Sequence, residues 1–126
     1  MVFDGIIEGR YVKLRSAMVE DAQVTLEMRQ NKKKTRFLHV VDNDIDKQIE
    51  WIKNQRKKEG DYFFVVLDHS DKIIGMMGIY EIKGDKGHNG RLLMYGNALQ
   101  SIEAYYLLYK FGFEELGLSC KVERGN

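Results

Sequence analysis

The turn at residues 95–101 carries the groups that could most readily hold a ligand. Residues 91–95, directly before it, form an apolar run that predicts a buried strand, and the pattern over 102–116 is helical. A strand that passes through a short turn into a helix leaves the first backbone N–H groups of the helix without intrahelical partners. Because these N–H groups and the helix dipole attract anions, the turn predicts a phosphate or carboxylate site.

The same turn has an interpretation that needs no ligand. Asn97 and Gln100 stand three residues apart, the spacing of a capping box in which asparagine replaces the usual Ser or Thr. Such a box uses one or two of the free donors. The amides from Leu99 to Ile102 therefore remain candidates for an anion.

Length and composition limit the class of protein. The chain has 126 residues, 44% hydrophobic and 31% charged, which indicates one soluble globular domain. Its formal net charge of +1 gives no reason to expect nucleic acid or a membrane surface as partner. A single cysteine, Cys120, excludes an internal disulfide and a cysteine-based metal site, and we expect no metal and a cytoplasmic location. No segment resembles a signal peptide or a membrane span.

Periodicity and turn residues predict the elements that position this turn. In order they are a strand over 10–15, a helix over 19–31, an extended segment over 37–41, a helix over 45–58, a hairpin of strands over 61–68 and 73–82, a strand over 88–95, the helix to 116 and a strand over 119–123. Gly75 and Gly78 inside one strand predict a bulge or the close approach of another backbone. The last strand–helix–strand step should be a parallel right-handed crossover, so we expect an α/β domain with a mixed sheet.

Several segments, taken in order, match the pattern of a known family. They are Arg15 with Glu20-Asp21-Ala22, Leu26-Glu27-Met28-Arg29-Gln30-Asn31 with Arg36-Phe37-Leu38, Ile49-Glu50-Trp51-Ile52, the hairpin with Ile74-Gly75, and Phe111-Gly112-Phe113-Glu114-Glu115-Leu116-Gly117-Leu118. In this order they resemble the GNAT superfamily of acyl-CoA-dependent N-acetyltransferases, in particular its ribosomal-protein-acetylating and sugar-acetylating branches. The resemblance runs from about residue 9 to residue 122. It implies a GNAT-like mixed sheet with helices on both faces.

The resemblance also implies acetyl-CoA as co-substrate and a primary amine, a protein N-terminus or an amino sugar, as acceptor. The residues expected to bind acetyl-CoA, mostly through their backbone, are Leu93, Met94, Tyr95, Asn97, Ala98, Leu99, Gln100, Ser101 and Ile102. This turn departs from the family pattern of Gln or Arg, then two residues, then Gly-x-Gly or Gly-x-Ala. Gly96 stands at the position of the Gln or Arg, Leu99 at that of the first glycine, and Ser101 at that of the second Gly or Ala. A leucine at position 99 limits how closely a pyrophosphate can approach.

A second departure lies at the end of the chain. Family members continue with another helix and two more strands, which commonly supply a tyrosine acid and part of the CoA cleft. A terminal strand without these neighbours leaves an open sheet edge, from which we predict a homodimer. The alternative to an enzyme is a truncated, non-catalytic acyltransferase-like fold that serves as a CoA-binding or interaction module.

Acetyl transfer to an amine needs a group that takes the amine's proton. Family members often place a glutamate near the start of the third hairpin strand, and His88 stands at about the matching position. An imidazole with an ordinary pKa near ~6.5 suits this role. The competing interpretation, which the sequence favours, is a solvent-exposed histidine in a Lys-Gly-His-Asn turn. Tyr80 and Glu81, at the end of the preceding strand, are the other candidates.

Two further groups have competing interpretations. Arg29, and Phe37 from the segment that resembles the family, are candidates for binding the acceptor. Arg29 could hold a carboxylate or phosphate, or could pair with a nearby acid. The aromatic residues of the last helix, Tyr105, Tyr106, Tyr109, Phe111 and Phe113, are predicted to pack as core against the sheet.

Overall fold

The computed structural model describes residues 1–33, 42–118 and 123–124. Its elements are β1 (Ile6–Glu8), β2 (Lys13–Ser16), the 3-10 turn η1 (Val19–Asp21), α1 (Ala22–Lys33), α2 (Asp42–Lys57), β3 (Tyr62–Leu67), β4 (Ile73–Lys83), β5 (Lys86–Met94), α3 (Ala98–Glu114) and β6 (Glu123–Arg124). The expected segment over 37–41 and most of the strand over 119–123 lie outside the described residues.

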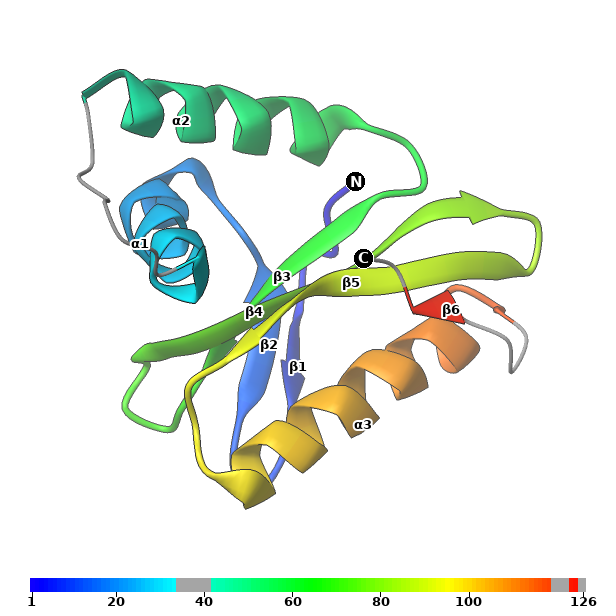
Figure 1. The fold of residues 1–126 in the computed structure, drawn as a ribbon. Coiled ribbons are helices and arrows are strands. Elements are labelled where there is room, and N and C mark those ends of the chain that lie inside the picture. The colour runs from blue at the N-terminus through cyan, green and yellow to red at the C-terminus, as the bar shows by residue number, and fades with distance from the viewer. Residues whose placement is uncertain (34–41, 119–122, 125–126) are drawn as a thin grey trace.

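The strands form one six-stranded sheet in chain order (Figure 1). β1 to β5 pair antiparallel, and β6 pairs parallel with β5 after the crossover through α3. The mixed sheet expected from the sequence is thus confirmed. The patterns did not predict β1, because two of its three residues are exposed and it lacks a continuous buried face.

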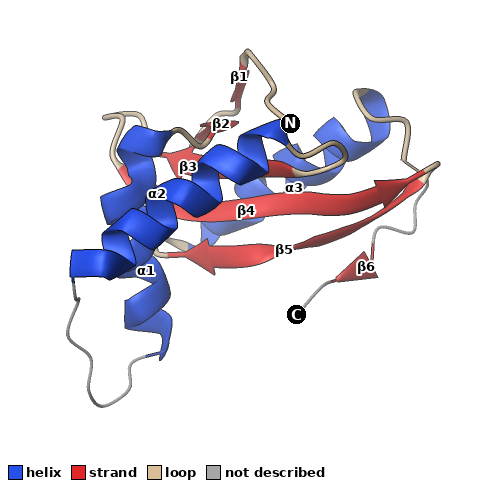
Figure 2. Ribbon diagram, turned by 90° about the horizontal axis from the view of Figure 1, so that it is seen from above, coloured by secondary structure: helices blue, strands red, loops and turns tan. Residues whose placement is uncertain are grey.

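Helices cover both faces of the sheet, as expected (Figure 2). α1 and α2 lie on one face, where Ile52 packs with Phe63 and Val65. α3 lies on the other, where Leu108 and Phe111 pack with Phe64 and its neighbours. The alternation of neighbouring β3 residues between the two cores follows from the two-residue period of a strand.

The two glycines of β4 lie where another backbone comes close. A Cβ on Gly75 would stand 2.6 Å from the carbonyl oxygen of Leu93, and one on Gly78 would stand 2.7 Å from that of Tyr62. The pairing of β4 with β5 also changes register, because Met76 faces Leu93 and Gly78 faces Gly90. One β4 residue therefore opposes two β5 residues, and both features that the glycines predicted are confirmed.

Two sequence-based expectations about burial are wrong. Of the five aromatic residues of α3, only Phe111 is buried, whereas Tyr106 and Phe113 are exposed. In the expected buried strand, Leu92 and Met94 are half-buried and Tyr95 is 51% exposed. The physical reason is the same: helical or strand periodicity shows that a face is apolar, but the number of neighbouring elements decides whether it is covered.

Candidate functional site

A capping box closes the first turn of α3, as its sequence predicted. The N–H of Gln100 donates to Oδ1 of Asn97, and the N–H of Asn97 donates to Oε1 of Gln100, each over 2.9 Å. The N–H of Ser101 donates to the carbonyl of Asn97 as the helical ladder begins. Ile102 follows within the helix, so the candidate anion donors narrow to the amides of Ala98 and Leu99.

The two unexpected residue types of this turn have different explanations. A Cβ on Gly96 would lie 2.5 Å from Oε1 of Gln100, so glycine here makes room for the capping box. Leu99 is 55% exposed and lies in the first turn of α3, where its own backbone carries one of the two amides. We expect its side chain to limit how closely a ligand can approach these donors.

The outer edge of β5 leads directly into this turn. The N–H of Tyr95 donates to the carbonyl of Ile74 on β4 over 2.7 Å. Because pairs alternate along an antiparallel ladder, the N–H and C=O of the preceding residue, Met94, point away from β4. In the described part of the chain, β6 pairs only with His88 and Asn89, so no described strand covers the edge at Met94.

A bulge separates the two halves of β5. Arg91 has a φ of +58°, a left-handed conformation that is unfavourable for any residue with a Cβ. Its guanidinium forms two hydrogen bonds with the buried carboxylate of Asp61, over 2.6 and 2.8 Å. It also lies over the rings of Tyr80 and Trp51, 4.2 and 4.9 Å from their centroids. We interpret this bidentate, stacked contact as the interaction that holds the bulge in place.

Sequence reasoning missed the pairing of Arg91 with Asp61. The two residues lie thirty positions apart, in different elements. An arginine within an apolar strand was the available signal, but nothing in the local pattern identified its partner.

The structure brings two of the proton-transfer candidates together. Tyr80 and His88 face each other across β4 and β5, with ring centroids 6.3 Å apart. Glu81 follows in an exposed position with a φ of +54°. Met94 lies six positions after His88 along β5, a distance of about 20 Å in an extended strand. A ligand that uses both ends of β5 must therefore be long and extended.

The structure shows no contact between the acceptor-binding candidate Arg29 and the described residues Tyr80, Glu81 and His88. Arg29 is exposed, and its Nη1 donates to Oε1 of Gln48, so its described hydrogen bond goes to an amide rather than to an acid. Nε2 of Gln48 in turn donates to Oγ1 of Thr25 over 3.0 Å. Gln48 on α2 therefore bonds two residues of α1, Arg29 and Thr25. Phe37 lies outside the described residues.

Glu103 anchors the start of α3 to the loop between β1 and β2. Its carboxylate accepts from the backbone N–H groups of Arg10, Tyr11 and Val12 over 2.7, 2.6 and 2.9 Å. Burial acts to raise the pKa of this carboxyl group. The three backbone hydrogen bonds outweigh that effect, so the pKa of Glu103 lies below its ordinary value.

A family model, described as an acetyltransferase (GNAT) domain, matches residues 12–124 of the chain. The chain belongs to the GNAT acetyltransferase family. The match spans nearly the whole chain, and it agrees with the mixed sheet and with the crossover from β5 through α3 to β6. No match was found among curated proteins.

Solved structures with the same fold include several GNAT enzymes. The chain is similar to FdhC, a nucleotide-linked sugar GNAT, with 23% identity over 92% of this chain and 70% of that one and a TM-score of 0.81. A ribosomal-protein-S5-alanine acetyltransferase from Vibrio fischeri shows 18% identity over 91% and 70%, with a TM-score of 0.68. A dodecameric spermidine N-acetyltransferase from Vibrio cholerae shows 16% identity over 85% and 65%, with a TM-score of 0.68.

No group of three or more His, Cys, Asp or Glu residues in the described part of the chain could hold a metal ion. No helix among the described residues has the length and apolar character needed to cross a membrane.

Proposed function

We propose that this GNAT chain binds acetyl-CoA along the outer edge of β5 and transfers its acetyl group to a primary amine. The observation that carries the proposal is a set of backbone groups with no partner among the described residues: the N–H and C=O of Met94, and the N–H groups of Ala98 and Leu99. The amides at the start of α3 suit the pyrophosphate, because they are free donors at a positive helix end. The N–H and C=O of Met94 suit the amide groups of the pantetheine arm, which would extend along β5 like a further strand.

The proposed reaction is direct transfer, without a covalent enzyme intermediate. The neutral amine attacks the thioester carbonyl, an N–C bond forms, the C–S bond breaks, and CoA leaves as the thiolate. The amine loses a proton to a base, and the thiolate gains one from an acid or from water. His88, paired with Tyr80 at the far end of β5, is our first candidate for the base, with Tyr80 and Glu81 behind it. Because about 20 Å of strand separates Met94 from His88, the thioester carbonyl would lie between them, with Met94 holding the pantetheine arm and a backbone N–H of β5 nearer His88 polarising the carbonyl.

The class of acceptor rests on the family and its structural neighbours. The neighbours are named for a nucleotide-linked sugar, a ribosomal-protein alanine and spermidine. We propose that the acetyl acceptor of this chain is the amine of a protein N-terminus or of an amino sugar. A cytoplasmic location and a homodimer through the open sheet edge remain proposals that follow from the composition and from the edge position of β6.

One observation favours the alternative, a non-catalytic CoA-binding module. Leu99 extends into solvent beside the proposed pyrophosphate donors, at a position where the family pattern has glycine. Calorimetry with acetyl-CoA and a thiol-release assay over peptides, amino sugars and polyamines separate the two functions. Binding with turnover supports the enzyme, and binding without turnover supports the module. Absence of binding contradicts both.

A further inference from the structure

The bulge of β5 takes a short stretch of backbone out of the sheet ladder. Gly90 and Leu93 pair with β4 residues that are only two positions apart, so Arg91 and Leu92 stand opposite a single β4 residue. A bulge leaves its extra residue unpaired. As far as the structure describes β6, it pairs only with two residues nearer the start of β5. The bulge therefore leaves a backbone N–H at position 91 or 92 without a described strand as partner.

Contacts of the Arg91 side chain offset the cost of its left-handed backbone. At a φ of +58° glycine would be the favoured residue, because it has no Cβ. The guanidinium forms its bidentate pair with Asp61, whose side chain is 3% exposed, and is itself 21% exposed. Nε2 of Gln55 on α2 also donates to Oδ1 of Asp61, over 3.1 Å. Because the carboxylate is held from α2 as well, it fixes the position of the guanidinium.

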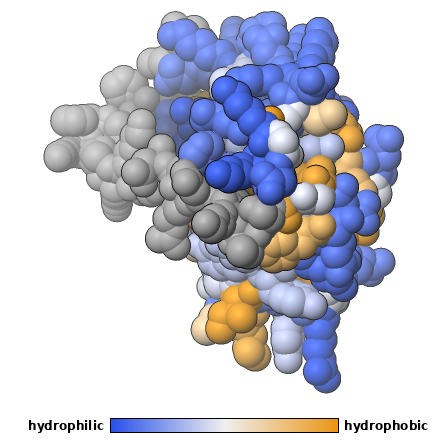
Figure 3. All heavy atoms as spheres, turned by 90° about the vertical axis from the view of Figure 1, so that its right-hand side faces the viewer, coloured by the Kyte–Doolittle hydropathy of each residue, from blue (hydrophilic) through white to orange (hydrophobic). Residues whose placement is uncertain are grey.

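Three aromatic rings hold the guanidinium from its sides. The ring centroids of Tyr80, Trp51 and Phe63 lie 4.2, 4.9 and 5.9 Å from Cζ of Arg91. Figure 3 shows mostly hydrophilic surface at the top of the molecule, where α2 lies, so the apolar side of this helix faces the sheet. Trp51 belongs to α2 and meets the ring of Phe63 edge to face at 5.3 Å. Arg91 thus links the bulge to α2, β3 and β4 at once.

Tyr80 carries the contact from Arg91 to the candidate base. Its ring lies against the guanidinium and also faces the ring of His88, with centroids 6.3 Å apart. A Cβ on Gly90 would collide with the hydroxyl group of Tyr80, so the glycine leaves room for this ring. The guanidinium, Tyr80 and His88 therefore follow one another on one face of the β4–β5 pair.

We infer that Arg91 is a positioning residue for acetyl transfer. Its contact with Asp61 holds the bulge in the conformation that turns a backbone N–H of residue 91 or 92 toward the acetyl carbonyl. The inference rests on the proposed function, which places that carbonyl between His88 and Met94. Arg91 lies three residues from each of them. It acts through the backbone and not by touching the substrate, so its effect should be confined to ligands that carry the carbonyl.

Arg91→Ala and Arg91→Gly separate this role from a merely stabilising one. Both remove the ion pair, but glycine adopts a positive φ readily and alanine does not. Calorimetry with acetyl-CoA and with free CoA measures the bond to the carbonyl, because CoA lacks the acetyl group. Arg91→Ala should raise the Kd for acetyl-CoA by roughly three- to tenfold and change that for CoA by about twofold or less. Arg91→Gly should raise the Kd for acetyl-CoA by roughly twofold or less.

Infrared spectroscopy of bound acetyl-CoA, labelled with ¹³C at the thioester carbonyl, reports the polarisation directly. A carbonyl that accepts a hydrogen bond absorbs at a lower wavenumber than the same carbonyl without one. We expect this downward shift in the unaltered chain and in Arg91→Gly, and a smaller shift in Arg91→Ala.

Arg15→Ala is the matched control. Arg15 forms a bidentate pair with Asp21, and their side chains are 23% and 5% exposed, close to the values for Arg91 and Asp61. This variant should lose similar stability in circular dichroism melts but keep both affinities and the infrared band. If Arg91→Ala does not fold, Arg91→Lys takes its place. Lysine keeps one contact to Asp61, so the same changes should appear, but smaller.

Several results would overturn the inference. One is an equal ratio of the Kd for CoA to the Kd for acetyl-CoA in the unaltered chain and in Arg91→Ala. Another is that alanine and glycine at position 91 behave alike. Binding of both ligands with an unshifted carbonyl band overturns this inference alone. If the unaltered chain binds neither ligand, the proposed function fails and the inference fails with it.

Discussion

Asn97 and Gln100 bind each other's backbone N–H at the start of α3, over 2.9 Å in both directions. The site that we assign to pyrophosphate is thus also the point where the helix is stabilised. Because the box uses the amides of Asn97 and Gln100 and leaves those of Ala98 and Leu99, stability and ligand binding should respond to different substitutions.

Asn97→Ala should lower stability and leave acetyl-CoA affinity nearly unchanged. It removes the acceptor of the Gln100 N–H, and loss of an N-cap side chain costs about 1 kcal/mol. Urea unfolding gives the change in free energy, and calorimetry gives the affinity. A large loss of affinity at unchanged stability would contradict our division of the donors.

Gln100→Glu should keep stability and weaken acetyl-CoA binding, the opposite of Asn97→Ala. Glutamate keeps the oxygen that accepts from Asn97 and is favourable in the first turn, so stability should be kept or slightly raised. Its negative charge beside Ala98 and Leu99 should weaken acetyl-CoA binding by roughly three- to tenfold, more at low salt than at high salt. Equal affinity for both chains at low ionic strength would argue against an anion at this turn.

Leu99→Gly should strengthen acetyl-CoA binding. The exposed side chain would no longer stand beside the donors, while glycine lowers helix stability by about 1 kcal/mol or less near the end of the helix. Leu99→Ala is the matched control, because it shortens the side chain without the backbone freedom of glycine. If both variants bind more weakly than the unaltered chain, Leu99 contacts the ligand favourably and does not obstruct it.

Glu103 should make stability depend on acidic pH. Its folded-state pKa lies below the ordinary value, so the native state favours the ionised carboxylate. This contribution is present above the unfolded-state pKa and is lost as pH falls through the folded-state pKa. The difference in unfolding free energy between the unaltered chain and Glu103→Gln should therefore shrink from about pH 6 to about pH 3.

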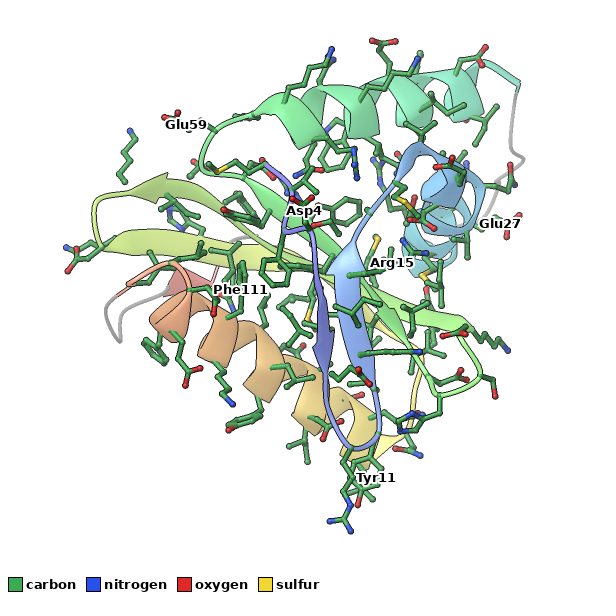
Figure 4. The ribbon with its side chains drawn as sticks, turned by 180° about the vertical axis from the view of Figure 1, so that it is seen from behind. Asp4, Tyr11, Arg15, Glu27, Glu59 and Phe111 are labelled. Carbon is green, nitrogen blue, oxygen red and sulfur yellow. The ribbon has the colours of Figure 1, made fainter. Side chains whose placement is uncertain are left out.

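Ser101→Ala, two residues before Glu103 on α3, is a control that should show no such pH dependence. Figure 4 labels Tyr11, whose N–H is one of the three donors, in the loop beside the start of α3. If the difference in unfolding free energy between the unaltered chain and Glu103→Gln stays constant with pH, the Glu103 carboxylate does not stabilise the fold through its charge.

The sequence by itself determined the local features of this protein. Alternation and helical spacing located the main elements, and Asn97 with Gln100 located the start of α3. Gly75 and Gly78 marked the close approach of neighbouring strands, because only a residue without a Cβ fits there. These features depend on a residue and its near neighbours in the chain, so they are visible in a linear pattern.

Only the tertiary structure decided which distant residues meet and which faces stay open. Arg91 binds Asp61, Arg29 binds Gln48, and Glu103 binds the β1–β2 loop, each across many residues of chain. The outward side of α3 is apolar in the sequence, yet its exposure depends on the absence of a covering element among the described residues. Periodicity reports the polarity of a face, whereas contact and burial depend on how separate elements pack in space.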